Sequence, residues 1–177
     1  MTLVENMIIS VQIVKLSDAT ELLNFELENR VWFEQHIPPR FDGFYSASGV
    51  KSQIKEFLNL YEYNTMIPMI LRTQDGEICG RLNLTMEDSD NNLGVIGYRI
   101  GEKFTRKGLA TQAIEYMQKY IHDQTQLTRL KAIVLSSNRG SSIALERNGF
   151  KVRAHLKEFA MLNGQQMNAY EYIWEKS

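Results

Sequence analysis

The sequence has a single cysteine, Cys79, and only three prolines among its 177 residues. One cysteine excludes a disulfide framework within the chain and is typical of a reducing compartment. No apolar run approaches the roughly 20 residues that a membrane-spanning helix requires. The N-terminus also lacks a signal-peptide pattern of basic start, apolar run and cleavage site. We therefore expect a cytoplasmic protein with no membrane partner.

An excess of charge of either sign is also missing. The chain has 20 Lys and Arg residues against 21 Asp and Glu residues, a formal net charge of −1. That balance gives no general attraction to nucleic acid, so we expect no nucleic-acid partner and any basic site must be local. The histidines, His36, His122 and His155, are widely separated and lack the spacing of metal ligands, so we expect no metal.

The hydrophobic pattern predicts an α/β (α+β) protein with a single domain over 1–177. Strands are expected at 7–14, 65–73, 77–86, 93–100, 130–135, 152–162 and 167–174. Helices are expected after a capping box of Asp18 and Glu21, at 49–63, after Gly108 and at 141–147. The first helix carries an apolar set of Leu22, Leu23, Phe25, Leu27 and Val31. Hairpins and one strand–helix–strand crossover predict a single mixed, mostly antiparallel sheet of about seven strands flanked by about four helices.

The most informative stretch is 97–110, GYRIGEKFTRKGLA. It predicts a strand that runs into a basic, glycine-containing loop, and the loop opens directly onto a helix. The first amides of a helix have no partner within the helix, and the dipole adds about half a positive charge there. Such an end binds phosphate. Lys103, Arg106 and Lys107 add three cations around the same point, and Gly108 lets a ligand approach the backbone.

Two common phosphate-binding patterns do not fit this loop. A Walker loop has two glycines followed by Lys and Ser or Thr, whereas Lys107 here precedes its glycine. A dinucleotide fingerprint has three glycines at fixed spacing after an early strand. Gly97, Gly101 and Gly108 do not have that spacing, and they lie past the midpoint of the chain.

A third pattern does fit. The loop 105–110 resembles the Q/R-x-x-G-x-G/A loop with which the GNAT superfamily of N-acetyltransferases grips the pyrophosphate of acetyl-coenzyme A (acetyl-CoA). The residues downstream agree in order and spacing: a strand core at 133–135, Asn-x-x-Ser at 138–141, a short helix, and Gly149-Phe150. The family's usual Gln or Arg falls on Thr105, which is a departure. Ile-Gly-Tyr at 96–98 and Leu-Asn-Gly at 162–164 are similar to the Rim-type ribosomal-protein alanine N-acetyltransferases.

The resemblance covers 93–177 and implies a GNAT fold with acetyl-CoA as cofactor and coenzyme A as product. It implies that backbone amides from Arg106 to Thr111 bind the pyrophosphate and that Asn138 hydrogen-bonds the pantetheine arm. An amide near Ile100 would serve as oxyanion donor if a local bulge leaves it unpaired in the sheet. The implied cofactor-binding residues are Tyr98, Ile100, Thr105, Arg106, Lys107, Gly108, Leu109, Ala110, Thr111 and Asn138.

Two residues are candidates for the proton transfers. Glu102 follows the strand and would act as a base through a water, or would simply face solvent. Ser141 begins the short helix and would protonate the leaving thiolate, or would cap the helix. Many GNAT enzymes use a tyrosine four residues after the serine position. Leu145 stands there, which shifts weight onto Ser141.

The acceptor is expected to be a primary amine, with the N-terminal α-amine of a protein or peptide as the first choice. An α-amino group has a pKa of about 8 and is partly neutral at cell pH. The alternatives are a small-molecule amine (a polyamine, an amino acid or an aminoglycoside) and a non-catalytic acyl-CoA-binding module. An acidic acceptor pocket would favour a polycation. The aromatic segment 36–45 would wall this pocket or merely anchor the chain, and a monomer or homodimer is expected.

Overall fold

The structure is a computed structural model that describes residues 9–88 and 92–177. One seven-stranded sheet runs in the order β1-β2-β3-β4-β5-β7-β6. Neighbouring strands are antiparallel except for β4 and β5, so the expected mixed sheet is confirmed. Residues 7 and 8 of the first expected strand lie outside the described residues. The strands are β1 Ser10–Ile13, β2 Met66–Arg72, β3 Ile78–Asp88, β4 Leu93–Ile100, β5 Arg129–Leu135, β6 Lys151–Leu162 and β7 Gln165–Glu175.

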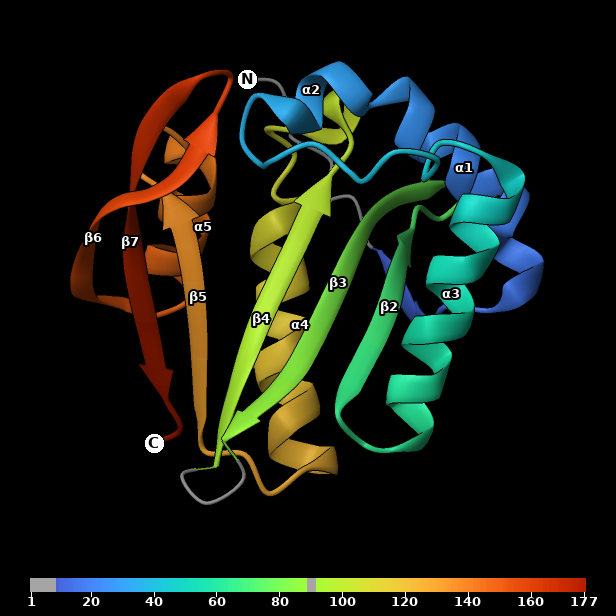
Figure 1. Ribbon diagram of the computed structural model, residues 1–177. Coiled ribbons are helices and arrows are strands. Elements are labelled where there is room, and N and C mark those ends of the chain that lie inside the picture. The colour runs from blue at the N-terminus through green and yellow to red at the C-terminus, as the bar shows by residue number, and fades with distance from the viewer. Residues whose placement is uncertain (1–8, 89–91) are drawn as a thin grey trace, which may run out of the picture.

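Helices cover both faces of the sheet. In Figure 1, α4 and α5 lie behind it and α3 lies in front, beside β2. The expected first helix is divided at Asn29 into two, which accounts for the additional helix. The helices are α1 Ala19–Glu28, α2 Arg30–Glu34, α3 Ala47–Glu62, α4 Leu109–Gln124 and α5 Arg139–Arg147, with 3-10 turns η1 Leu16–Asp18 and η2 Glu102–Phe104.

Each face of the sheet has its own apolar core. Leu82 and Leu84 alternate along β3 and pack with Ile114 and Met117 of α4, and all four are fully buried. On the opposite face, Ile70 belongs to a second buried cluster with side chains of α1 and α3. Because successive strand residues point to opposite faces, β2 and β3 each contribute side chains to both cores.

The capping box expected at Asp18 and Glu21 is wrong. Asp18 stands at the N-cap of α1, but its side chain makes no capping hydrogen bond. Instead, Arg72 of β2 donates to Asp18 Oδ1 at 2.9 Å and to both carboxylate oxygens of Glu21 at 2.8 Å. The Asp18 carboxylate also accepts from Lys15 N–H at 2.7 Å and so caps η1, while the charge-assisted contact with Arg72 joins both acids to β2.

The strands β4 and β5 diverge after a short parallel pairing. Their register covers only 93–95 of β4 against 129–131 of β5, and β5 then pairs along its length with β7. The register of β3 with β4 continues as far as Ile100, so the second half of β4 has one free edge. Figure 1 shows the two strands opening apart. The pairing of β3 with β4 has no register shift near Ile100, so the opening comes from divergence of β4 and β5 and not from the bulge considered in the sequence analysis.

Candidate active site

The free edge of β4 presents backbone hydrogen-bonding groups to the opening. Gly101 N–H donates to the Cys79 carbonyl at 3.0 Å. This bond sets the register, so the backbone N–H and C=O groups of the odd-numbered residues of β4 point toward β3. Since the groups of an antiparallel strand alternate, those of Tyr98 and Ile100 face the opening. The Ile100 carbonyl there accepts from Trp32 Nε1 at 3.2 Å. An amide donor therefore stands where the sequence analysis expects one, although its role in catalysis stays a prediction.

The loop that precedes α4 has the backbone geometry of an anion site. Arg106 and Gly108 both have left-handed conformations, with φ of 61° and 77°. Alternation of right- and left-handed residues makes neighbouring N–H groups converge, and a non-glycine residue in this conformation is strained. The first helical bond runs from Gln112 N to Gly108 O at 3.0 Å. The amides of Leu109 to Thr111 therefore have no partner within α4.

These groups border a cleft of about 550 Å³ between β4, α4 and α5. Glu102 and Lys107 do not line it; the other residues predicted for the site do. They are Tyr98, Ile100, Thr105, Arg106, Gly108, Leu109, Ala110, Thr111, Asn138 and Ser141. The structure thus brings together residues from three elements that are separate in the sequence.

Of the three cations expected around the phosphate, only Arg106 lines the cleft. Lys103 forms an ion pair with Glu77, and its ammonium lies 5.0 Å from the ring centroid of Phe104. The Lys107 ammonium lies 5.9 Å from the same centroid. Lys103 and Lys107 therefore do not border the cleft with Arg106, and Lys103 is paired with a neighbouring carboxylate.

Two arginines that the sequence analysis did not consider line the cleft instead. Arg139 and Arg147 belong to α5 and border the cleft together with Ile143. Their spacing of four residues puts all three on one face of a helix. That spacing within the expected short helix is the signal that could have found them. No Asp or Glu stands among the described residues that line the cleft.

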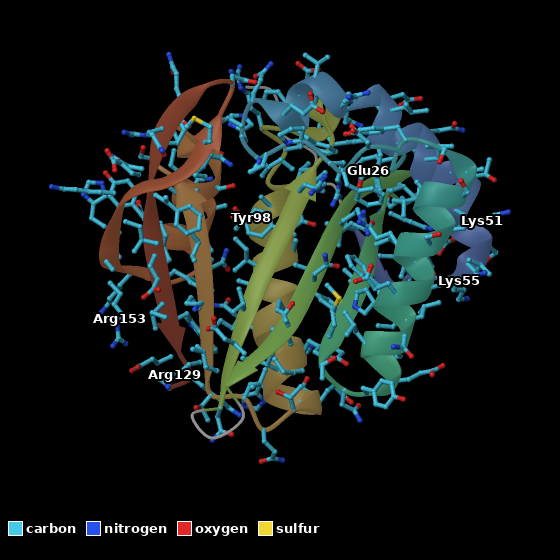
Figure 2. The ribbon with its side chains drawn as sticks, viewed as in Figure 1. Glu26, Lys51, Lys55, Tyr98, Arg129 and Arg153 are labelled. Carbon is cyan, nitrogen blue, oxygen red and sulfur yellow. The ribbon has the colours of Figure 1, made fainter. Side chains whose placement is uncertain are left out.

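A second pocket of about 310 Å³ lies against β3, β4 and β5. It is bordered in part by Asn83, Gly97 and Phe159. The segment 36–45, expected to wall an acceptor site, contributes four residues to the lining: His36, Ile37, Pro38 and Arg40. The residues that line both the cleft and this pocket are His36, Ile37, Tyr98, Arg99, Asn138 and Ser141. The two cavities therefore meet at the free edge of β4, where Figure 2 labels Tyr98.

The junction is held by hydrogen bonds between β4 and α5. Tyr98 Oη donates to the Ser141 carbonyl at 3.3 Å, and burial raises the pKa of Tyr98 to about 12, so its hydroxyl stays protonated. Asn138 Oδ1 accepts from Ser141 N at 3.3 Å and caps α5. Asn138 is thus the helix cap, and the capping role considered for Ser141 is taken by another residue.

Glu102, the base expected from the sequence, and His36, a second candidate in the structure, differ in position. Glu102 is exposed and lines neither cavity, and its backbone N–H donates to Asn29 Oδ1 at 2.8 Å. His36 lines both cavities, and its buried Nδ1 has no hydrogen-bond partner among the described residues. Burial lowers the pKa of His36, which keeps the imidazole neutral near pH 7. The sequence analysis weighed the histidines only as metal ligands and so missed His36.

A buried ion cluster forms one wall of the second pocket. The Glu26 side chain is 0% exposed. Its carboxylate oxygens form ion pairs with Arg81 at 2.8 Å, Arg40 at 3.1 Å and Arg99 at 3.2 Å. Burial alone would raise the pKa of Glu26, but the guanidiniums of Arg99, Arg81 and Arg40 together lower it. Burial lowers the pKa of Arg99 to about 10, which still leaves it charged at neutral pH. Glu26, labelled in Figure 2, is thus outnumbered by cations.

The described residues contain neither a membrane-spanning helix nor a cluster of metal ligands. No helix within 9–88 or 92–177 is both long and apolar enough to cross a membrane. In the same ranges, no group of three or more His, Cys, Asp or Glu side chains could hold a metal ion.

Comparison with known sequences gives one family and several relatives. The model of the acetyltransferase (GNAT) domain matches residues 11–151. The chain is 27% identical over 169 residues to a probable N-acetyltransferase, YjcK, of Bacillus subtilis, covering 94% of this chain and 89% of the relative. It is 25% identical over 157 residues to the [ribosomal protein uS5]-alanine N-acetyltransferase of Escherichia coli, covering 88% and 81%.

Solved structures share the fold. A ribosomal-protein-S5-alanine acetyltransferase from Vibrio fischeri superposes with a TM-score of 0.90 at 20% identity, over 96% of this chain and 93% of the other. RimL, a ribosomal L7/L12 alpha-N-protein acetyltransferase in complex with coenzyme A, gives a TM-score of 0.88 at 18% identity, over 95% and 94%. These findings confirm both the fold and the Rim-type resemblance expected from the sequence.

Proposed function

The chain belongs to the acetyltransferase (GNAT) domain family and is an N-acetyltransferase, and from this premise we propose that it acetylates the N-terminal α-amine of a protein or peptide, with acetyl-CoA as donor. The observation that carries the proposal is the meeting of two cavities at the free edge of β4. Direct transfer requires donor and acceptor at one point, and a shared wall of Tyr98, Asn138 and Ser141 provides it.

The cleft suits acetyl-CoA as the residues stand. The pyrophosphate would bind the free amides of Leu109 to Thr111, with Arg106 beside them. Arg139 and Arg147 would pair with the remaining phosphate charge. No Asp or Glu among the described residues of the cleft competes for them. The pantetheine arm would then add along the free edge of β4. When bound, acetyl-CoA supplies the activated acetyl group.

The chain's own residues would manage charge and protons at the junction. Direct attack by an amine needs no enzyme nucleophile, and the amide of Ile100 would stabilise negative charge that develops on an oxygen in the opening. Ser141 would return a proton to the leaving sulfur, because it lines both cavities. His36 would accept the proton of the amine, since it is neutral and lines both cavities. Glu102 remains the second candidate for this role.

The charge of the second pocket disfavours the polyamine alternative. The three arginines of the Glu26 cluster line this pocket, and one carboxylate, that of Glu26, pairs with all three. A polycation would meet repulsion there, whereas the sequence analysis required an acidic pocket for such an acceptor. The names of the uS5-alanine N-acetyltransferase and of the L7/L12 alpha-N-protein acetyltransferase, which both name a ribosomal protein as acceptor, agree with this choice.

We also propose that the chain is a single GNAT domain. One sheet takes β1 from near the start of the described chain and β6 and β7 from near its end. Strands from both ends would have to separate from a common sheet to make two domains.

The test is an acetyl-transfer assay read by mass spectrometry. Peptides with N-terminal Ala or Ser are compared with the same peptides blocked at the N-terminus and with spermidine. Acetylation of the free peptides alone supports the proposal, whereas acetylation of spermidine alone contradicts it. Acetyl-CoA binding without transfer to any of these amines would also contradict the proposed acceptor.

A variant of Gly97 tests the acceptor pocket separately. Gly97 lines the second pocket only, and a Cβ built there meets no atom within 4 Å. Gly97→Val should therefore fold and narrow the pocket, raising KM for the peptide while acetyl-CoA affinity stays unchanged. An unchanged peptide KM would contradict the assignment of this pocket to the acceptor.

A further inference from the structure

The second pocket contains more positive charge than its own carboxylate can pair. Glu26 Oε1 accepts from Arg40 and Arg81, and Glu26 Oε2 accepts from Arg99. Both oxygens of one anion are thus used by three cations, which leaves two net positive charges in the cluster. All three arginines line the pocket, and the Arg81 side chain is only 4% exposed. Such an excess is costly in a desolvated site unless a ligand supplies the missing anion.

Polar atoms without partners point to the same ligand. Arg40 Nε and Asn83 Oδ1 are buried and have no hydrogen-bond partner among the described residues, and both residues line this pocket. Buried polar groups are nearly always paired, so each such exception needs an explanation. Arg40 Nε is a donor and suits a carboxylate, whereas Asn83 Oδ1 is an acceptor and suits an N–H group. A peptide with an acidic side chain offers both.

The guanidiniums are held in fixed orientations by aromatic rings. Arg40 lies 4.6 Å from the ring centroid of Phe44, and Arg99 lies 4.9 Å from that of Phe33. Arg81 lies 5.6 Å from the ring centroid of Phe57. Stacking and ion pairing together restrict the long side chains, so little freedom is lost when a ligand binds. The cluster is thus built for recognition as well as for packing.

From this arrangement we propose that the second pocket is a carboxylate subsite, and that the acceptors are peptides with Asp or Glu among the residues that follow the N-terminus. The inference rests on the proposed function and gives its substrate class. Arg99 lines both cavities, so the cluster reaches the junction where the amine must lie. An acidic residue close to the N-terminus can therefore occupy the subsite while its α-amine faces the cleft.

The test uses a peptide beginning Ala-Glu-Glu and the matched peptide beginning Ala-Gln-Gln. The wild-type enzyme should prefer the acidic peptide by at least about tenfold in kcat/KM, because hydrogen bonds between charged groups are the strong ones. Arg40→Gln should bring the ratio close to one. Arg40→Lys keeps the charge but loses the planar fork, and should give an intermediate ratio. Calorimetric titration with acetyl-CoA shows that each variant is folded.

Arg30→Gln is the matched control. Arg30 also stacks on an aromatic ring, that of Tyr45, and forms an ion pair with Glu34, but it does not line the second pocket. The ratio of this variant should equal that of the wild type. A loss of preference equal to that of Arg40→Gln would contradict the assignment of the subsite to the Glu26 cluster.

The outcomes separate this inference from the proposed function. Equal acetylation of both peptides by the wild type would overturn the inference and leave the proposed function standing. A further pair, alanine and alaninamide, distinguishes a free amino acid as the source of the carboxylate. Acetylation of alanine alone would retain the subsite but overturn the peptide acceptor, and with it the proposed function. Acetyl-CoA binding without acetylation of any of the four acceptors would overturn both.

Discussion

Glu26→Gln should destabilise the protein strongly. The substitution keeps the shape of the side chain but removes the one anion that compensates Arg40, Arg81 and Arg99. The Glu26 side chain is 0% exposed, so water cannot replace it. Removing one partner of a buried ion pair costs about 3–5 kcal/mol. Because glutamine can still accept a hydrogen bond, we expect the lower end, about 3 kcal/mol of the free energy of unfolding.

Urea unfolding measures this loss, and its pH dependence tests the cause. The pKa of Glu26 is lowered in the folded state from a usual value of 4.5. Its ionised form therefore stabilises the fold above that value, and the contribution is lost as pH falls through the lower, folded pKa. The wild type should lose stability in that acidic range, and the variant should lose less, so their free energies of unfolding should converge.

Glu34→Gln is the control for removing a carboxylate. Glu34 pairs with Arg30 at 3.1 Å in an i,i+4 arrangement, with side chains 29% and 52% exposed. Such surface pairs contribute about 0.3–0.5 kcal/mol. If Glu26→Gln lost less than about 1 kcal/mol, or lost the same amount at every pH, the reasoning about the cluster would be refuted.

Three further predictions concern single side chains. Ser141→Ala should lower kcat about a hundredfold with acetyl-CoA affinity unchanged, and full activity would exclude it as the acid. The wild-type kcat/KM should fall as pH drops through the pKa of His36, which burial lowers from 6.5. His36→Gln should remove this acid limb and Glu102→Gln should not; the opposite result would make Glu102 the base. Burial raises the pKa of the Cys79 thiol to about 11, so a thiol reagent at pH 8 should label it only in urea, and rapid native labelling would contradict its burial.

Much of the fold follows from local patterns in the sequence. The strand predicted at 93–100 has those bounds in the structure, because β-branched residues and a glycine-rich end define it locally. The apolar stripe of the first helix was a poorer guide. Leu22 and Phe25 are buried as expected, but Leu27 and Val31 are 47% and 76% exposed. Leu27 lies within α1 but about 140° around the helix from the buried Leu22, and Val31 lies beyond the interruption at Asn29, where the helical phase has ended.

The candidate site also has a part that the sequence predicts and a part that only the folded structure shows. The loop that precedes α4 could be predicted because its helix N-terminus and glycine are adjacent in the sequence, and ten of the predicted site residues line one cleft. The Glu26 cluster could not, since its arginines come from a loop and two strands that only the folded sheet brings together. Lys103 shows the opposite error. Its position in the sequence predicted a place beside Arg106 at the anion site, but its ammonium pairs with Glu77, which lies between β2 and β3. Long-range pairing decides which charges remain available to ligands.

Calorimetric titration with acetyl-CoA tests the central claim most directly. The wild type should bind with a Kd on the order of micromolar, and Gly108→Glu should abolish binding by placing a carboxylate at the phosphate loop. Gly76→Glu is the matched control, because Gly76 has a similar φ of 86° against 77° for Gly108, lies in the turn between β2 and β3, and lines neither cavity. Binding retained in that control and lost in Gly108→Glu would support the donor cleft. A wild type that does not bind acetyl-CoA, or a Gly108→Glu variant that binds it equally well, would contradict the account.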